Sequence, residues 1–236
     1  MNQPEVELED LGLIDYKQCW DYQTKLFDAS VQLKIKNRKF PENWVSTKNH
    51  LIFCEHPHVY TLGKSGDLKN LLIDGPKRKE KNISFYKINR GGDITYHGPG
   101  QLVVYPILDL DYFFSDIHKY LRLLEESVIL TLNDYGIAGK RLDGFTGVWV
   151  DAEKDYPRKI CAIGVKCSRW VTMHGIGFNI NSNLDYFKHI VPCGNEDKSV
   201  TSLQKEINQK IDMKELKLRF KKNFKTLFGI NWVDKK

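Results

Sequence analysis

Hydrophobic positions recur along the chain at two spacings, and the wider spacing predicts helices. Three segments, at about 16–36, 116–135 and 212–227, show apolar residues at helical spacing, which is imperfect in the first. Ser115 or Asp116 can cap the second segment at its start. Three helices of ordinary length are therefore expected.

Shorter apolar runs predict strands between these helices. The run 102–108 is apolar almost throughout, which is typical of a strand buried in a core. Other strand-like runs lie at 52–54, 59–62, 145–151, 159–166 and 169–180. The segment 66–81 is expected to be an exposed loop. Because helices and strands are interspersed, the expected fold class is α/β or α+β, with a mixed β-sheet flanked by helices.

Size and composition favour a single compact unit. The chain has 236 residues, of which 41% are hydrophobic, and we find no internal repeat or long linker. No apolar run approaches the roughly 18 residues of a membrane helix. The acidic N-terminus has no apolar signal core, so we expect a cytoplasmic protein. The five cysteines are an odd number without C-x-x-C spacing, which argues against a disulfide framework and a structural zinc site.

The positive charge has two interpretations. The net charge is +6, and basic residues cluster at 77–81 and 217–222. Both clusters fit ordinary solvated surface, and both also fit a docking face for an acidic partner. Since the sequence contains no nucleic-acid-binding module, an acidic protein is the better candidate for such a partner.

A glycine-rich segment, Arg90 to Gln101, directly precedes the core strand at 102–108. Its glycines require backbone that turns sharply or passes close to another group, and it also carries arginine, aspartate and histidine. A polar loop that leads into a core strand is a common place for a binding site. The segment lacks the residues of a phosphate-binding loop, and a glycine-rich hairpin with solvated side chains fits its pattern as well.

Two further segments carry candidate chemistry. Lys159 begins an apolar run, so it either extends from the strand end into solvent or points into a cleft. In the run 169–180, alternation places His174 on the face of Thr172, Ile176 and Phe178, where a core histidine is the default expectation. Gly175 and Gly177 fall on the opposite face and leave room for a ligand.

Cys193 is the strongest candidate for a reactive thiol. It lies between Pro192 and Gly194, in a turn after a short helix expected at 184–190, whereas the other four cysteines fit small core residues. A free cysteine has a pKa of about 8.5, so a nearby cation is needed to favour the thiolate. Lys159 is a candidate for that cation.

Several segments together resemble one known family. Arg90 to Leu102 resembles the signature of the octanoyltransferases of lipoate synthesis, the lipoyl(octanoyl) transferase B family. The resemblance is collinear over about residues 50–205, and it includes the segments 147–150, 158–164, 174–179, 190–194 and 200–203.

This resemblance implies a fold, an activity and a set of site residues. The fold would be that of the catalytic domains of biotin and lipoate protein ligases, formed here by the whole chain, 1–236. Cys193 would form an acyl-thioester, and Lys159 would tune its pKa and act as acid and base. His97 and His174 would border the reacting carbonyl. The implied acyl pocket comprises Arg90, Gly91, Gly92, Asp93, Ile94, Thr95, Tyr96, His97, Ala162, Ile163, Gly164, His174, Gly175, Ile176 and Gly177.

The implied reaction needs neither metal nor cofactor. An octanoyl group would pass from octanoyl-acyl carrier protein to a lysine on the lipoyl domains of 2-oxoacid dehydrogenase complexes or on the glycine-cleavage H protein. No nucleic acid or membrane would take part, and the enzyme would be a monomer. Backbone N–H groups near Gly91 or Gly194 are candidates to stabilise the tetrahedral oxyanion.

Three alternatives remain open. An ATP-dependent lipoate ligase would share the fold, although the lysine-containing nucleotide motif expected of it is not evident. A non-catalytic carrier-binding module would not need Cys193. A thioester or amide hydrolase would use Cys193 with His97 or His174.

Overall fold

The computed structural model of the chain describes residues 3–191 and 199–234, and a large mixed β-sheet forms its centre. The strand order is β12-β1-β2-β6-β10-β9-β8-β7, and β11 pairs with β9. The strands of this sheet are β1 (Glu5–Leu13), β2 (His50–Glu55), β6 (Gln101–Ile107), β7 (Gly139–Leu142), β8 (Phe145–Val150), β9 (Arg158–Ser168), β10 (Val171–Asn179), β11 (Ser199–Val200) and β12 (Asn231–Val233). Parallel and antiparallel pairs both occur, so the predicted mixed sheet is confirmed.

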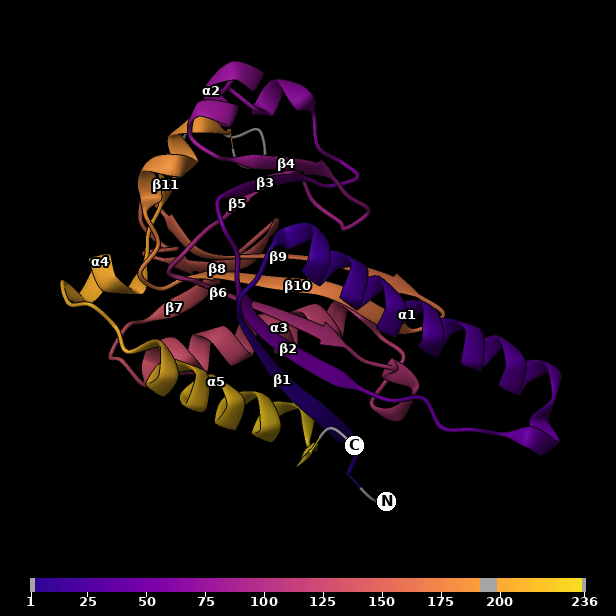
Figure 1. The fold of residues 1–236 in the computed structure, drawn as a ribbon. Coiled ribbons are helices and arrows are strands. Elements are labelled where there is room, and N and C mark those ends of the chain that lie inside the picture. Colours follow the sequence, from indigo (N-terminus) through magenta and orange to yellow (C-terminus); the bar gives the residue numbers. More distant parts are fainter. Residues whose placement is uncertain (1–2, 192–198, 235–236) are drawn as a thin grey trace.

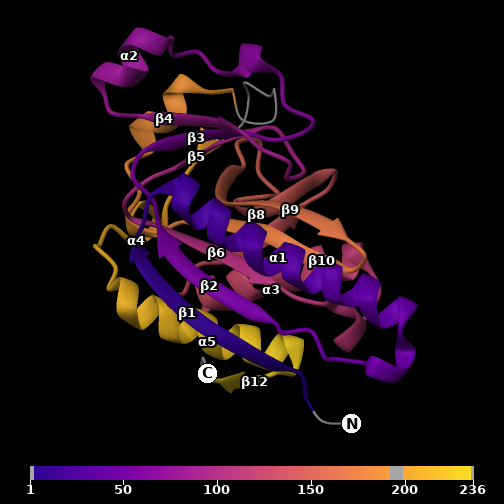
Figure 2. The same cartoon turned by 45° about the vertical axis from the view of Figure 1, so that its right-hand side comes forward.

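Helices cover both faces of this sheet (Figures 1 and 2). Helix α1 (Tyr16–Lys39) packs on β6 and β10 from one side, whereas α3 (Ile117–Asn133) and α5 (Met213–Phe228) pack on each other and cover the opposite face. The shorter helices are α2 (Gly75–Glu80), α4 (Leu203–Ile207) and the 3₁₀ helices η1 (Pro41–Asn43), η2 (Leu68–Asn70), η3 (Leu110–Tyr112) and η4 (Leu184–His189). None of the described helices is long and apolar enough to cross a membrane.

The two-sided cover explains the apolar run that forms β6. Leu102 and Val104 belong to the core under α3 and α5, whereas Val103 and Tyr105 belong to the core under α1. Successive side chains of a strand point to opposite faces, so a strand covered on both sides must be apolar throughout. The predicted core strand is confirmed.

Local sequence signals account for the three long helices. The carboxylates of Asp15, Asp116 and Asp212 accept backbone N–H bonds at the first turns of α1, α3 and α5. Gly229 ends α5 in a left-handed conformation, which glycine adopts without strain. All three predicted helices are confirmed.

A small second sheet lies above the α1 side of the large sheet, at the top of Figure 1. Its strand order is β4-β3-β5, with β3 at Val59–Leu62, β4 at Ser84–Lys87 and β5 at Ile94–His97. The segment 66–81, expected to be an exposed loop, is largely exposed but not all loop, because η2 and α2 lie within it. Asp67 and Asp74 cap these two short helices with their side chains.

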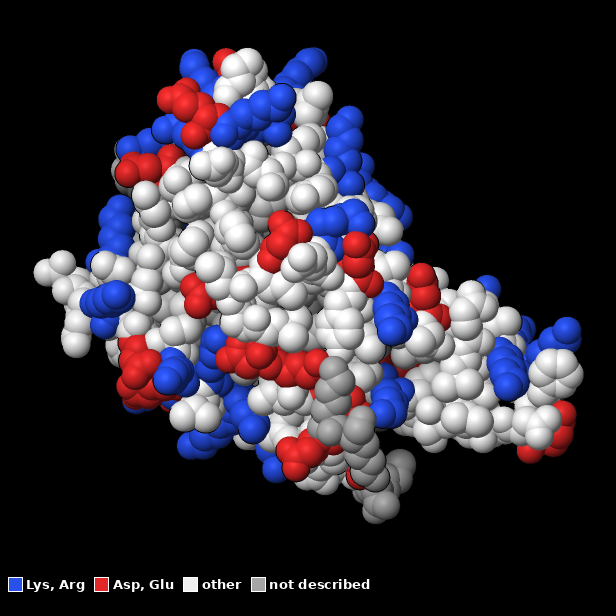
Figure 3. All heavy atoms as spheres, in the orientation of Figure 1, with Lys and Arg blue, Asp and Glu red and all other residues white. Residues whose placement is uncertain are grey.

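The two basic clusters lie on different parts of the surface, one over α2 and one along α5 (Figures 1 and 3). Within the second cluster, Lys217 pairs with Asp10 and Arg219 pairs with Glu215. Part of the positive charge on α5 is therefore balanced within the chain.

The described cysteines are mostly core residues, as predicted. Cys19, Cys54 and Cys161 are buried, whereas Cys167 is only half-buried. Burial raises the pKa of the Cys54, Cys161 and Cys167 thiols, which keeps these groups protonated at neutral pH.

Candidate functional site

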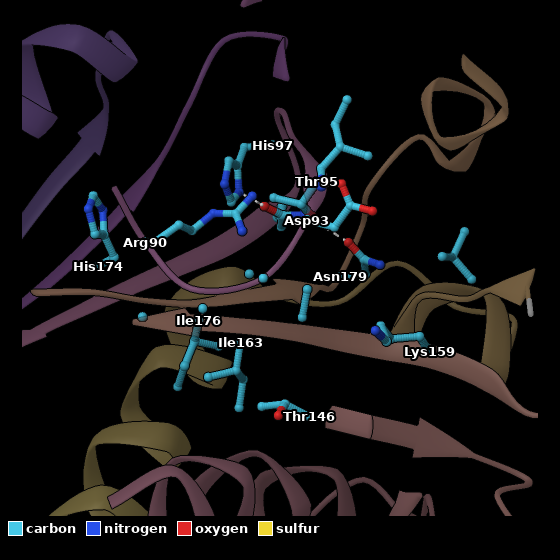
Figure 4. A pocket seen from close by; sticks show the side chains of 18 of the residues that line it. Arg90, Asp93, Thr95, His97, Thr146, Lys159, Ile163, His174, Ile176 and Asn179 are labelled. Atoms are coloured by element: carbon cyan, nitrogen blue, oxygen red, sulfur yellow. Dashed lines mark hydrogen bonds between the residues drawn. The ribbon is translucent and has the colours of Figure 1, made fainter. Parts of the chain in front are cut away.

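A cavity of about 430 Å³ lies between the large sheet and the segment 90–97 (Figure 4). Strands β9 and β10 form its floor, and the loop before β5 together with β5 forms its roof. Fourteen of the residues expected from the sequence line it: Arg90, Gly92, Asp93, Ile94, Thr95, His97, Lys159, Ala162, Ile163, Gly164, His174, Gly175, Ile176 and Gly177.

Gly91 and Tyr96 are not among the lining residues. The Tyr96 side chain is buried within the small sheet, where its hydroxyl lies 2.8 Å from His58 Nδ1. The Gly91 N–H donates to the Val165 carbonyl at 2.9 Å, so this amide is already engaged and is not an oxyanion donor. Cys193 and Gly194 lie outside the described residues.

Small residues keep the floor of the cavity open. A Cβ atom at Gly177 would lie 3.2 Å from Gln101 Oε1 and 3.4 Å from a His97 ring carbon. A Cβ at Gly164 would lie 2.8 Å from the Gly91 carbonyl oxygen. The segment 90–97 therefore approaches the sheet more closely than larger residues would allow.

Arg90 and Asp93 hold the roof in place. The Arg90 guanidinium donates to the carbonyl of Thr61 at 2.8 Å and to that of Gly91 at 2.9 Å, which ties the loop to β3. Asp93 accepts from the Asn70 side-chain amide and from the Ile94 N–H. Charge in this loop is thus used to fix the backbone, which the glycines leave conformationally free.

Lys159 lies at one end of the cavity with its ammonium group over the face of Trp149, 4.6 Å from the ring centre. Its side chain is buried, so the strand-end lysine points into the cleft and does not extend into solvent. The backbone at this point is paired on a second side, because Thr201 N–H donates to the Lys159 carbonyl at 2.9 Å.

His174 does not share a face with Ile176 and Phe178, contrary to the alternation expected along β10. It has a left-handed φ of 61°, which turns its side chain to the cavity side of the sheet with Arg90, while Ile176 points to the other side (Figure 4). This conformation is unfavourable for a residue with a Cβ and persists only where neighbours hold it. Here Gln23 accepts the His174 N–H, and Asn89 Oδ1 lies 3.1 Å from Nε2.

Lys159 and His174 lie far apart along the floor. Phe178 pairs with Cys161, so Lys159 is level with residue 180, six residues from His174. At about 3.3 Å per strand residue, the two levels are roughly 20 Å apart. The cavity therefore has a lysine end and a histidine end (Figure 4).

The histidines at the cavity are neutral. Burial lowers the pKa of His97 to about 3, and the nearby His56 and Arg90 contribute in the same direction. Burial likewise lowers the pKa of His174 to about 3. Neither imidazole is therefore a strong base at neutral pH.

Sequence reasoning missed several polar lining residues, among them Tyr16, Gln101, Tyr105 and Asn179. One signal was available for Asn179, because it follows Gly175 and Gly177 at strand spacing and so shares their face. Gln101 belongs to the glycine-rich segment, but its role depends on partners distant in the sequence.

Three metal-ligand side chains gather on the α1 side of the large sheet. The ligand atoms of Cys19, Cys54 and His56 lie within 4.8 Å of one another, and all three residues are buried. His56 Nδ1 lies 2.8 Å from the Ile14 carbonyl, which can only accept, so Nδ1 carries the proton. His56 Nε2 then accepts from the Tyr105 hydroxyl at 2.9 Å. These hydrogen bonds account for the arrangement of the imidazole without an ion.

Comparisons with known proteins assign the chain to a family. The family model of the lipoyl protein ligase A/B catalytic domain matches residues 15–225. An octanoyltransferase of Christiangramia forsetii is 59% identical over 225 residues, which cover 95% of this chain and 96% of the relative. The chain belongs to the octanoyltransferase family. Members of this family are acyltransferases, so the resemblance found in the sequence is confirmed and the chain is an enzyme of this type.

Solved structures extend the likeness to the fold of this family. A bipartite lipoate protein ligase from Thermoplasma acidophilum superposes with a TM-score of 0.68 at 15% identity, over 100% of this chain and 87% of that one. A biotin protein ligase from Aquifex aeolicus gives 0.50 at 17% identity, over 94% and 70%. At this identity the likeness concerns the fold alone, and it confirms the expected fold, that of the lipoate and biotin protein ligases.

Proposed function

We propose that the enzyme transfers an octanoyl group from octanoyl-acyl carrier protein to a lysine of a lipoyl domain, through a thioester on Cys193. The acceptors are the lipoyl domains of 2-oxoacid dehydrogenase complexes and the glycine-cleavage H protein. The chain acts as one catalytic domain over 1–236, as a monomer and without a cofactor. The observation that carries this proposal is the buried Lys159 at one end of the cavity, in a chain of the octanoyltransferase family.

The chemistry proceeds in two balanced steps. The Cys193 thiolate attacks the carbonyl carbon of the thioester donor, the carrier's thiolate leaves, and it takes a proton from the Lys159 ammonium. Lys159, now neutral, removes a proton from the acceptor ammonium. The resulting amine attacks the acyl-enzyme and the Cys193 thiolate leaves. The nitrogen releases its second proton to solvent as the amide forms. Splitting the transfer in this way separates two encounters between large proteins.

The connections around Lys159 support its assignment. Ser199 and Val200, the first described residues after 192–198, pair with Arg158 and Lys159. Val191, the last described residue before that segment, donates its N–H to the Asn70 carbonyl, and the Asn70 side chain contacts Asp93 at the cavity. Both described flanks of the segment that contains Cys193 are therefore anchored at the cavity.

We place the acyl chain along the floor, from Lys159 toward His174. The seven C–C bonds of an octanoyl group, each about 1.5 Å, span at most roughly 10 Å. Since the two ends of the floor are about 20 Å apart, an octanoyl group with its carbonyl beside Lys159 ends roughly 10 Å short of the level of His174. In this arrangement His174 does not border the carbonyl.

The neutral histidines weigh against a hydrolase that uses Cys193 with either of them. Such an enzyme needs an imidazole that accepts the thiol proton, whereas burial lowers the pKa of both His97 and His174 to about 3. Lys159 supplies the acid as its ammonium form and the base as its neutral amine form.

The test is an intact-mass measurement after mixing the enzyme with octanoyl-acyl carrier protein in the absence of ATP. We expect one added octanoyl group, which hydroxylamine removes and which Cys193→Ala lacks. Cys167→Ala is the matched control, because this half-buried thiol lies on the same strand as Lys159. An enzyme that forms no adduct and acts only with ATP is a ligase, and one that releases octanoate without an acceptor as fast as it transfers the group is a hydrolase.

A further inference from the structure

A chain of buried amide hydrogen bonds runs from the cavity to the strand beside Lys159. His97 Nδ1 lies 2.6 Å from Gln101 Oε1, and Gln101 Nε2 lies 2.9 Å from Asn179 Oδ1. Asn179 Nδ2 in turn lies 3.1 Å from the Thr201 carbonyl oxygen. All four residues are buried, and they come from the end of β5, the start of β6, the end of β10 and the segment after β11.

Backbone carbonyl groups that accept from this hydrogen-bond network fix the orientation of each side chain in the network. The Thr201 carbonyl can only accept, so Asn179 must present its NH₂ there and its oxygen to Gln101. Gln101 must then present its NH₂ to Asn179, and the same NH₂ also donates to the Tyr96 carbonyl at 3.1 Å. The Gln101 oxygen is left facing His97, so His97 must carry its proton on Nδ1.

The other ring nitrogen of His97 is thereby determined. The neutral ring carries a single proton, so Nε2 is an acceptor. Among the described residues, no hydrogen-bond donor reaches Nε2, and His97 lines the cavity. Protonation of the ring is disfavoured by burial and by nearby Arg90 and His56. His97 Nε2 is thus a neutral hydrogen-bond acceptor with a fixed orientation at the cavity.

We propose that Gln101 and Asn179 are positioning residues, which hold His97 in the Nδ1–H tautomer so that Nε2 accepts a hydrogen bond from the bound substrate. This role rests on the proposed transferase function. The group that donates this hydrogen bond is an N–H, either on the arm that carries the thioester of octanoyl-acyl carrier protein or on the acceptor lysine. The same chain ends on Thr201, whose N–H donates to the Lys159 carbonyl, so one network aligns His97 with the lysine end of the cavity.

Gln101→Glu is the decisive variant. Its carboxylate faces the Nδ1–H of His97 and stabilises the imidazolium, so Nε2 gains a proton and changes from acceptor to donor. In ¹⁵N-histidine-labelled wild type we expect the ring-nitrogen signals of an Nδ1–H tautomer, unchanged between pH 8 and 5. In the variant we expect protonation of both nitrogens within this range, and a kcat/KM for octanoyl transfer lower by 10-fold or more that recovers as pH rises.

Gln23→Glu controls for a buried amide-to-acid change, because Gln23 is buried and contacts His174 but not His97. It should leave the His97 signals in place. If Gln101→Glu does not fold, Gln101→Met serves instead. It removes the acceptor for Nδ1–H, so in a fraction of the molecules the His97 proton should lie on Nε2.

Two results would overturn the proposal: a wild-type His97 with its proton on Nε2, or a Gln101 variant whose His97 signals shift while kcat/KM stays within twofold at every pH. An Nδ1–H tautomer in an enzyme that transfers no octanoyl group would instead refute the transferase function. That result would also refute the role of His97 in transfer, while the hydrogen-bond geometry around His97 would stand.

Discussion

Lys159 and Trp149 are cross-strand partners on β9 and β8, and the lysine ammonium lies 4.6 Å from the centre of the indole ring. Both side chains are buried, so the ring face stabilises a cation that has little contact with water. A buried lysine held in this way is placed to exchange a proton inside the cavity.

Replacing Lys159 by methionine should abolish most of the activity while preserving the fold. Loss of a positioned acid and base typically lowers the rate by about 10²–10⁴-fold. Lys166→Met is the control, since Lys166 lies on the same strand and over an aromatic ring, that of Phe27. Equal octanoyl transfer by the two variants, measured with a lipoyl-domain acceptor, would rule out the role given to Lys159.

Trp149→Leu should weaken both stability and transfer. The change leaves a cavity at a buried position and removes the ring face, with an expected loss of about 2–4 kcal/mol in the free energy of unfolding. Trp170→Leu, at an exposed tryptophan, should cost much less. Denaturant unfolding measures both, and a Trp149→Leu enzyme with wild-type kcat would show that the ring contributes to packing alone.

The stability of the enzyme should fall as the solution becomes acidic below about pH 6.5. Burial lowers the pKa of His97 to about 3 from 6.5, so the folded enzyme keeps this ring neutral while the unfolded chain protonates it. The unfolded state then binds more protons between about pH 6.5 and 3, which costs the fold about 1.4 kcal/mol per pH unit for each such histidine. Above this window the contribution is fully present.

His97→Gln isolates this effect. Urea unfolding at pH 7, 6 and 5 should give a shallower pH dependence for this variant than for the wild type. His118→Gln, at an exposed position, should keep the wild-type slope. Identical slopes for all three proteins would mean that His97 does not remain neutral in the folded state.

The pattern of apolar residues along single strands predicted the core strand correctly. The predicted side-chain face was wrong where a strand departs from regular alternation. The apolar run of β6 predicted a strand covered on both faces because its own residues form both cores. His174 broke the pattern through a left-handed φ, which is rare for a residue with a Cβ and depends on Gln23 and Asn89, far away in the sequence.

Pairings distant in the sequence set the rest of the site. Nothing local to Gln101 indicates that it meets Asn179, 78 residues later, or that Thr201 lies beyond it. Similarly, the glycine-rich segment predicted a binding loop, but only tertiary contact shows that the Gly91 amide is bonded to Val165. Residue types thus identified the segments of the cavity, whereas its hydrogen bonds required the assembled sheets.

Gly177→Ala should change acyl-chain selectivity without unfolding the enzyme. The added methyl group would lie at ordinary to tight contact distance from His97 and Gln101, on the cavity side of β10. It therefore narrows the proposed acyl channel, and kcat/KM for octanoyl donors should fall by about 10-fold relative to shorter butanoyl donors. Gly175→Ala is the contrasting variant, because its methyl group would meet the Val104 carbonyl oxygen at 2.2 Å, a backbone atom that cannot move aside. That change should lower the free energy of unfolding by about 1–3 kcal/mol. An unaltered ratio of octanoyl to butanoyl transfer in Gly177→Ala would place the acyl chain elsewhere in the cavity.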